Sequence, residues 1–440
     1  WPGGCFADDY HWRDGVGPAE RRPRRVNMHW GNVIETNQFG THEFIRLCRA
    51  AGAQPYLCGN VGSGTPQELR DWVEYCNFPG GSSLSDERRA NGAEAPFGVR
   101  YWGVGNENWG CGGSFTPEDY GTEYRRFAGY LRDWGGTALF RIACGPNGND
   151  LEWTRRFFRK LKSDYGDGPC VHGFSAHYYT WNAHGKYGSA TEYNKEQWYG
   201  LLGQSLRMED LVVQQRLAMD EVDPYGKIGL IVDEWGTWHP STSGKNPKFL
   251  WQQNTVRDGL VAALTLDIFN RHADKVVMGN IAQTINVLQA LLLTEEHKLI
   301  KTPTYHVYDL YSPHQGGRAV RLESSSPHIS YLDDGAAAEI ASVAGSASIK
   351  NDLCTVTLVN VHAEEPMELV IKPIGASVAE AGPVIGLTYP SGELQSHNTA
   401  ENLQCVAPGS LASADTSHSK QVKLTLRPAS VTRLQLKMAR

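Results

Sequence analysis

Short apolar runs alternate with longer segments of helical periodicity between residue 53 and about residue 286. One intervening segment, residues 116–134, opens with Thr116 as a candidate N-cap and Pro117 at the first helical position. Strand-length runs separated by helix-length segments predict a parallel β-sheet that is covered by helices. The apolar runs comprise residues 53–60, 99–107, 140–148, 171–179, 228–236 and 276–286.

The pattern changes after about residue 311. Apolar and polar residues then alternate with a period of two, as in residues 354–361, 367–373 and 422–428, with Gly, Ser and Pro between the runs. This alternation predicts the antiparallel strands of a β-sandwich. We therefore expect two domains, the first over residues 1–312 and the second over residues 313–440.

Charge and hydropathy exclude several classes of partner. The chain has 440 residues, a net charge of −6 and an isoelectric point near 6.2. A chain with this balance lacks the basic surface that a phosphate backbone requires, so no nucleic-acid partner is expected. No apolar run reaches the ~18 residues of a membrane span, and the start of the sequence lacks the layout of a signal peptide. We expect a cytoplasmic protein without a membrane partner.

Cysteine and aromatic content narrow the picture further. Nine cysteines are an odd number, and none of them forms a C-x-x-C pair. The pattern argues against a zinc ribbon or a disulfide framework and favours a reducing compartment. The 13 tryptophans and 19 tyrosines exceed what a core requires. Aromatic faces beside polar groups suit sugar rings, although most large aromatic residues pack in cores.

Two of the apolar runs end in a carboxylate flanked by aromatic residues and glycine. Glu107 follows one run, in VRYWGVGNENWG, and Glu234 ends another, in IGLIVDEWG. In a (β/α)8 TIM barrel, side chains at the carboxyl ends of the strands form the active site. If the last apolar run is the eighth strand, Glu107 follows the fourth strand and Glu234 the seventh. This spacing predicts two carboxyl groups on opposite sides of the barrel mouth, as glycoside hydrolysis requires. A doubly wound sheet is disfavoured because no glycine cluster fits the phosphate-binding loop that such a sheet usually has.

Several motifs together resemble one known family. GNENWG and DEWGTW, with PGGCFADDYHWRDGVGP near the start and ETNQFGTHEF after it, resemble the family 51 glycoside hydrolases, the α-L-arabinofuranosidases, over about residues 1–310. The resemblance implies a retaining double displacement with Glu107 as general acid/base and Glu234 as nucleophile. It implies release of terminal α-L-arabinofuranosyl residues from arabinan- and arabinoxylan-type oligosaccharides, with no metal and no organic cofactor.

The resemblance also implies which residues contact the sugar. Asn106 matches an asparagine that hydrogen-bonds the sugar 2-hydroxyl, and Tyr179 matches a tyrosine that orients the nucleophile. Cys5 stands where the family usually has a sugar-contacting asparagine. Asp233, which precedes the proposed nucleophile, is expected to be structural. The remaining expected substrate-binding residues are His177, which would position the catalytic groups, Gln283, and the aromatic walls Trp30 and Trp238.

The strand count places Trp1 at the end of the second barrel strand, so the first strand and most of the second are expected outside this chain. Other interpretations stay open. The same machinery could have β-xylosidase or endo-β-1,4-glucanase specificity, or the chain could be a carbohydrate-binding protein without catalysis. A zinc-dependent barrel hydrolase is disfavoured because the sequence has no H-E-x-x-H motif. We also expect a homo-oligomer.

Overall fold

The computed structural model describes residues 1–165, 171–411, 414–418 and 420–439. The chain divides into two compact units. Unit 1 consists of Trp1–His177 and Val213–Asp233, and unit 2 consists of Tyr178–Val212 and Glu234–Arg440. The domain boundary expected between residues 312 and 313 stays a prediction. Within the described ranges, no helix combines the length and the apolar character that crossing a membrane requires.

A parallel sheet has the strand order β3-β4-β5-β6-β7-β8, and each strand begins inside one of the predicted apolar runs. The register pairs Tyr56 of β3 with Tyr101 of β4, and Tyr101 with Phe140 of β5. Strands β6 and β7 run from unit 1 into unit 2, to which β8 belongs. The predicted βα sheet is thereby confirmed. The bounds are β3 (Tyr56–Gly59), β4 (Tyr101–Val104), β5 (Phe140–Ala143), β6 (Gly173–Trp181), β7 (Gly229–Trp238) and β8 (Val276–Ile281).

Helices in unit 1 begin where the sequence supplies a cap. The Thr116 hydroxyl accepts a hydrogen bond from the Asp119 backbone N–H at 3.2 Å, and Pro117 is in the first turn of α4, as predicted. The helix ends at Ala128, well before the expected Trp134. The described elements are α1 (Thr41–Ala51), α2 (Pro66–Asn77), α3 (Ser83–Ala90), α4 (Pro117–Ala128), α5 (Leu151–Tyr165), the 3-10 helices η1 (Gly4–Asp8), η2 (Trp12–Gly15) and η3 (Ala19–Arg21), the hairpin β1 (Arg25–Asn27) and β2 (Val33–Glu35), and α7 (Arg207–Asp220), which joins the units.

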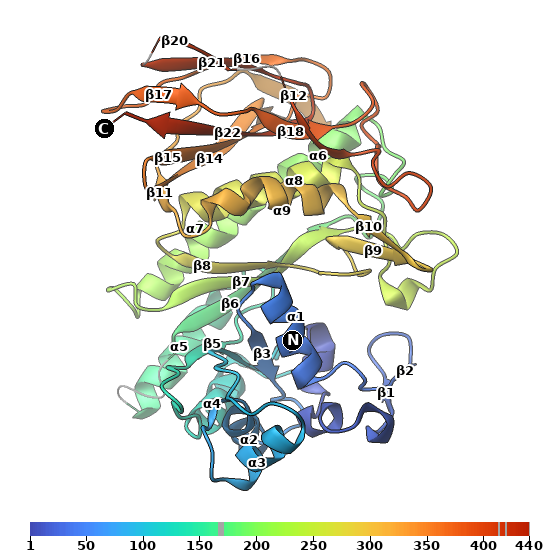
Figure 1. The fold of residues 1–440 in the computed structure, drawn as a ribbon, viewed down its shortest axis with the longest axis vertical. Helices are drawn as coiled ribbons and strands as arrows, with labels where there is room; N and C mark the ends of the chain where they lie inside the picture. The colour runs from blue at the N-terminus through green and yellow to red at the C-terminus, as the bar shows by residue number, and fades with distance from the viewer. Residues whose placement is uncertain (166–170, 412–413, 419, 440) are drawn as a thin grey trace. The chain divides into compact units, whose positions relative to one another are not determined.

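In unit 2, two helices pack against an antiparallel sheet. Helices α8 and α9 lie side by side against its strands (Figure 1). Asp267 of α8 accepts hydrogen bonds from the hydroxyls of Tyr311 at 2.9 Å and Thr357 at 3.2 Å, which joins both helices to the sheet. The remaining elements outside the sandwich are α6 (Lys195–Ser205), α8 (Val256–Arg271), α9 (Pro303–Tyr311), η4 (Pro247–Phe249), η5 (Ser312–His314), β9 (Leu292–Glu295) and β10 (Lys298–Lys301).

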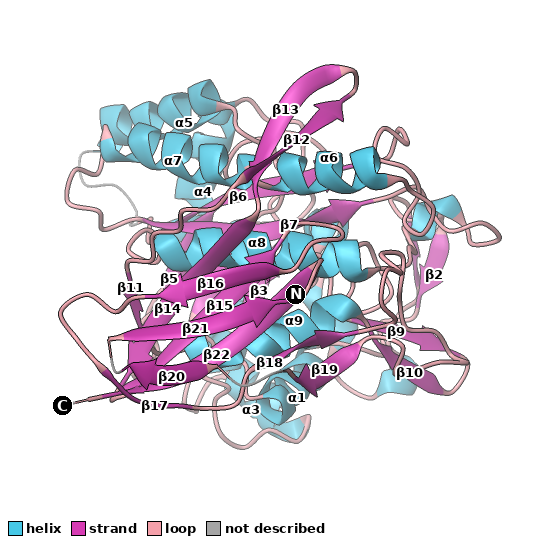
Figure 2. Ribbon diagram, turned by 90° about the horizontal axis from the view of Figure 1, so that it is seen from above, coloured by secondary structure: helices cyan, strands magenta, loops and turns pink. Residues whose placement is uncertain are grey.

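Two antiparallel sheets form the predicted β-sandwich at the end of the chain. One has the order β11-β14-β15-β22-β18-β19 with β17 paired to β22, and the other has the order β16-β21-β20 (Figure 2). Val356, Leu434 and Leu424 share one core between the sheets. The hairpin β12–β13 packs beside α6. The bounds are β11 (Arg318–Val320), β12 (His328–Asp333), β13 (Ala336–Ala341), β14 (Val343–Lys350), β15 (Leu353–Asn360), β16 (Met367–Ile371), β17 (Val378–Ala381), β18 (Ile385–Thr388), β19 (Ala407–Ser410), β20 (Asp415–His418), β21 (Gln421–Leu426) and β22 (Ser430–Met438).

Candidate active site

The segment that follows β4 carries Glu107 in an unusual backbone conformation. Gly105 has a φ of 84° and Glu107 a φ of 45°, both in the left-handed region. Gly105 adopts this region freely because it has no Cβ, whereas Glu107 does so at a cost on the order of 1–3 kcal/mol. The Glu107 carbonyl accepts hydrogen bonds from the backbone N–H groups of Gly110 at 2.8 Å and Gly112 at 3.1 Å. The segment is therefore a tight turn that holds Glu107 at the carboxyl end of β4.

Glu107 belongs to a chain of polar side chains within unit 1. Its Oε1 lies 3.0 Å from His177 Nδ1, and His177 Nε2 lies 3.1 Å from Asp233 Oδ1. The Tyr56 hydroxyl donates to Asp233 Oδ2 at 2.9 Å. The side chains of Glu107 and His177 are 17% and 7% exposed. The network therefore lies largely out of solvent, and its groups are strongly coupled to one another.

The Tyr56 hydroxyl is a proton donor at one end of this network. Burial raises the pKa of Tyr56 well above its usual value, and the charge of Asp233 adds to the shift, so the hydroxyl keeps its proton and donates. His177 lies between the two carboxyl groups, with Nε2 facing Asp233 and Nδ1 facing Glu107. The arrangement suits a carboxyl group that alternates between acid and base.

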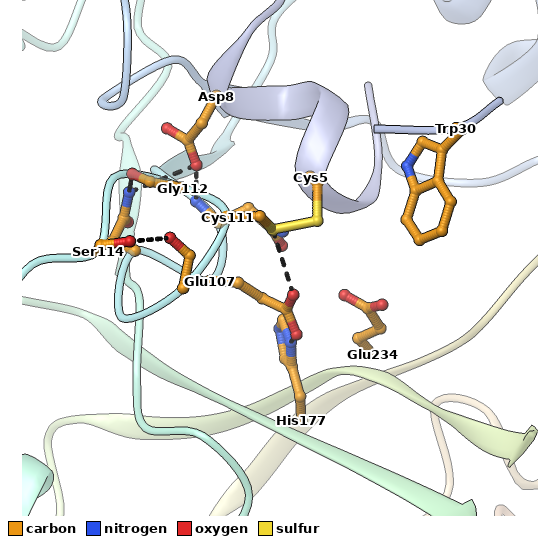
Figure 3. The surroundings of a disulfide bond; sticks show 12 residues. Cys5, Asp8, Trp30, Glu107, Cys111, Gly112, Ser114, His177 and Glu234 are labelled. Atoms are coloured by element: carbon orange, nitrogen blue, oxygen red, sulfur yellow. Dashed lines mark hydrogen bonds and ion pairs between the residues drawn. A yellow bond between two sulfur atoms is a disulfide. The ribbon is translucent and has the colours of Figure 1, made fainter. Parts of the chain in front are cut away.

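Cys5 forms a disulfide with Cys111, and the two Cα atoms are 5.5 Å apart. One sulfur of this bond lies 3.5 Å from Glu107 Oε2 (Figure 3). A disulfide sulfur has no proton to donate, so this is a packing contact. Cys5 therefore has no free thiol at the position where the family usually has a sugar-contacting asparagine. Neither sulfur offers a thiolate for a metal ion either, although both lie close to the Glu107 carboxylate.

Two more of the expected residues, Asn106 and Trp30, lie in unit 1. Asn106 precedes Glu107, and its buried Nδ2 has no hydrogen-bond partner among the described residues. Trp30 is half-buried and lies beside η1, where a Cβ on Gly4 would be 4.0 Å from the indole nitrogen. Figure 3 shows the Trp30 ring on the side of η1 that carries Cys5. Unit 1 thus brings Asn106, Glu107, His177 and Cys5 together, with Trp30 nearby.

Unit 2 places the other expected residues. The Tyr179 hydroxyl of β6 donates a hydrogen bond to Glu234 Oε1 of β7. The ring of Tyr179 meets Trp238 edge-on, with centroids 4.9 Å apart. Gln283 follows β8, and its carbonyl accepts a hydrogen bond from Leu291 N–H at 3.1 Å. Tyr179, Glu234 and Trp238 therefore form one cluster, and Gln283 is held by its own loop.

Sequence analysis missed three residues of unit 1. The Tyr56 hydroxyl donates a hydrogen bond to Asp233, and Cys111 forms the disulfide with Cys5. Asp8 accepts a hydrogen bond from the Asn106 backbone N–H at 2.7 Å. Burial raises the pKa of Asp8 to about 7, while the hydrogen bonds that it accepts act in the opposite direction. The available signal was that Cys5 stands inside one of the family motifs and that Cys111 directly follows another.

The sequence matches two family models that together span most of the chain. Residues 1–197 match the "Alpha-L-arabinofuranosidase 1 domain", and residues 233–430 match the "Alpha-L-arabinofuranosidase C-terminal domain". The chain is 41% identical over 411 residues to the intracellular exo-alpha-L-arabinofuranosidase of Bacteroides ovatus, which covers 93% of this chain and 77% of that relative.

Solved structures are similar over nearly the whole chain. The GH51 arabinofuranosidase from Xanthomonas axonopodis pv. citri has a TM-score of 0.92 at 40% identity, covering 99% of this chain and 86% of that one. The alpha-L-arabinofuranosidase from Thermotoga maritima, solved as an arabinose complex, has a TM-score of 0.82 at 28% identity with the same coverage of 99% and 86%. The chain therefore belongs to the α-L-arabinofuranosidases of glycoside hydrolase family 51.

Proposed function

We propose that this chain is a retaining glycoside hydrolase that releases terminal α-L-arabinofuranosyl residues from arabinan- and arabinoxylan-type oligosaccharides. The observation that carries the proposal is a pair of supported carboxylates, with Glu107 bonded to His177 and Glu234 to Tyr179. The relatives are named as arabinofuranosidases, which supports the substrate class and does not favour β-xylosidase or endo-β-1,4-glucanase specificity. A binding protein without catalysis has no need of two carboxylates supported in this way.

The two carboxylates have different tasks in the proposed reaction. Glu234 attacks the anomeric carbon, while Glu107 transfers its proton to the leaving-group oxygen. In the second step Glu107 removes a proton from water, which releases arabinose and frees Glu234. Retention requires the two carboxyl groups to lie roughly 5–5.5 Å apart. Carboxyl groups and water suffice for this chemistry, so no metal or cofactor takes part in either step.

The supporting contacts fit these tasks. Tyr179 donates to Oε1 of Glu234 and so orients the carboxylate that attacks. His177 contacts one oxygen of Glu107, which leaves Oε2 as the oxygen that carries the proton to the leaving group. The buried Nδ2 of Asn106 has no partner among the described residues, which supports its proposed bond to the sugar 2-hydroxyl. We assign Gln283, Trp30 and Trp238 to sugar contact as well.

The test removes the proposed nucleophile and replaces it chemically. In Glu234→Gly, hydrolysis of an activated aryl α-L-arabinofuranoside should fall by several orders of magnitude while the protein stays folded. Azide can occupy the vacated space and attack from the face that Glu234 used. NMR should then identify the β-arabinofuranosyl azide. Unchanged hydrolysis, or formation of the α-azide alone, would remove Glu234 from the nucleophile role.

Two expectations about the whole protein belong to this proposal. The Bacteroides ovatus relative is named as intracellular, which supports action on oligosaccharides inside the cell. We also propose a homo-oligomer, which light scattering during size-exclusion chromatography would measure directly. A mass equal to that of one chain would contradict it.

A further inference from the structure

The short helix η1 is attached at two points to the turn of residues 105–112, which carries Glu107 and is called the Glu107 turn below. Cys5 in η1 is bonded to Cys111, in the turn that closes on the Glu107 carbonyl. Asp8, the last residue of η1, accepts a hydrogen bond from the Asn106 backbone N–H at 2.7 Å. These links join residues 106 and 98 positions apart in the sequence. The turn that carries Glu107 is therefore held on both flanks by the same distant element.

Asp8 also ties this turn to the end of β3. Its Oδ1 accepts hydrogen bonds from the backbone N–H groups of Val61 at 2.7 Å and Gly62 at 2.8 Å. Its Oδ2 accepts a hydrogen bond from the side-chain N–H of Asn108 at 3.4 Å, in addition to the one from the backbone N–H of Asn106. The residue is only 5% exposed. A buried carboxylate with four N–H donors is a fixed junction, because each lost bond would leave a buried donor unpaired.

The contacts around this junction are tight. A Cβ on Gly112 would lie 2.6 Å from Asp8 Oδ2 and 2.1 Å from the Asn106 carbonyl oxygen. On the other side of the turn, the disulfide sulfur of Cys111 lies 3.5 Å from Glu107 Oε2. The two oxygens of Glu107 are thus contacted separately, one by His177 and the other by the disulfide (Figure 3).

We propose that Asp8 and the Cys5–Cys111 disulfide form a two-point clamp that positions Glu107 for proton donation to the leaving group. Asp8 is then a positioning residue that acts through the backbone of Asn106 and the turn that follows. The inference rests on the acid/base role proposed for Glu107.

The clamp matters because proton transfer depends on alignment. Glu107 has a left-handed backbone conformation that an unrestrained glutamate rarely adopts, so the turn would relax if its attachments were cut. A displacement of about 1 Å can lower the rate of a positioned catalytic step by about 100-fold. The rate should fall in the step in which the leaving group takes a proton from Glu107. Substrates whose leaving groups depart without protonation should be spared.

The test measures kcat/KM across aryl α-L-arabinofuranosides, from dinitrophenyl to phenyl leaving groups. Because kcat/KM reports the step in which the leaving group departs, its dependence on leaving-group pKa shows how much the acid assists. In Asp8→Asn, either orientation of the amide turns its NH₂ group toward at least one of the four N–H donors. We expect kcat/KM to fall about 10-fold or more for phenyl and to stay within about threefold for dinitrophenyl.

Asp9→Asn is the matched control, because it makes the same chemical change one residue further on. Among the described residues, the Asp9 side chain makes no hydrogen bond to the Glu107 turn, so kcat/KM should keep its wild-type dependence on the leaving group. Thermal unfolding of both variants shows whether they are folded. A second arm of the test, on the disulfide, leaves Asp8 unchanged, so it can still refute the proposal if Asp8→Asn fails to fold.

The second arm opens the disulfide in the wild-type protein. A phosphine reductant takes up the oxygen of one water molecule and converts the disulfide to two thiols, which gain two protons and two electrons. The reduced protein should show the same steeper leaving-group dependence as the double variant Cys5→Ser/Cys111→Ser. The reductant should not change the double variant.

Three outcomes decide the proposal. Steeper dependence in Asp8→Asn and in the reduced protein supports the clamp. Equal losses for all leaving groups, or wild-type behaviour in both arms, would overturn it. Glu107→Ala separates this failure from that of the proposed function. If Glu107→Ala shows steep dependence while the clamp variants do not, only the clamp is wrong, and if Glu107→Ala shows none, the acid/base role is also wrong.

Discussion

Removal of the Tyr179 hydroxyl tests how the proposed nucleophile is held. Tyr179→Phe deletes the O–H donor to Glu234 Oε1 and leaves the ring in place against Trp238, at a centroid distance of 4.9 Å. A hydrogen bond to a charged group contributes roughly 1.5–3 kcal/mol. Since about 1.4 kcal/mol corresponds to a factor of ten in rate, kcat/KM should fall roughly 10- to 150-fold. Because the ring packing is kept, Tyr179→Phe should remain folded under the assay conditions.

Tyr178 provides the control on the same strand. Its hydroxyl donates to the Gln204 carbonyl at 2.7 Å rather than to Glu234, so Tyr178→Phe should cost about 1 kcal/mol of stability without a matching loss of kcat/KM. The assay is steady-state hydrolysis of para-nitrophenyl α-L-arabinofuranoside, with unfolding followed by circular dichroism. If Tyr179→Phe stays within about twofold of wild type, or loses no more activity than Tyr178→Phe, the hydrogen bond to Glu234 has no catalytic role.

Three further predictions concern other residues. Glu107→Ala with azide should yield the α-arabinofuranosyl azide by NMR, because azide then attacks the covalent intermediate from the face that water uses, and the β-azide would contradict the assignment. In Asn106→Ala, the penalty for a substrate that lacks the 2-hydroxyl should shrink by roughly 10-fold or more relative to wild type, and an unchanged penalty would remove that contact. Burial raises the pKa of Asp267 to about 7 from its ordinary 3.8, so the stability contributed by its protonated form is complete below pH 3.8 and is lost as the pH rises through 7. Asp267→Asn, which stays neutral, should flatten the slope of unfolding free energy against pH over this range, and an unchanged slope would show that Asp267 is not its source.

Local patterns predicted much of the fold. The apolar runs that became β3 to β8 are short and lie between helical segments, and Thr116 caps α4 as its position predicts. Period-two alternation in residues 354–361 predicted β15 of the sandwich. These predictions succeed because neighbours in the sequence decide periodicity and capping. The expected end of α4 at Trp134 was wrong because Gly129 and the residues after it form a turn and an isolated bridge instead.

Contacts between distant residues could not be predicted in this way. Tyr56 and Asp233 are 177 residues apart, and Cys5 and Cys111 are 106 apart. Periodicity shows which face of a strand is buried but not which side chains the folded chain brings together. The odd number of cysteines argued against a disulfide framework, and it could not exclude one isolated bond. Asp8 stands inside a family motif, but its role could not be predicted because it comes from the backbone N–H groups that surround it.

In the proposed reaction Glu107 acts as acid and base, and Glu234 acts as nucleophile. The most direct measurement is intact-protein and peptide mass spectrometry of Glu107→Ala after brief reaction with dinitrophenyl α-L-arabinofuranoside. This leaving group departs without acid assistance, and loss of the base slows release of the covalent intermediate. We expect one arabinosyl unit per chain, attached to the peptide at Glu234. A protein that turns over substrate without carrying any label, or that carries the label on another residue, would contradict it.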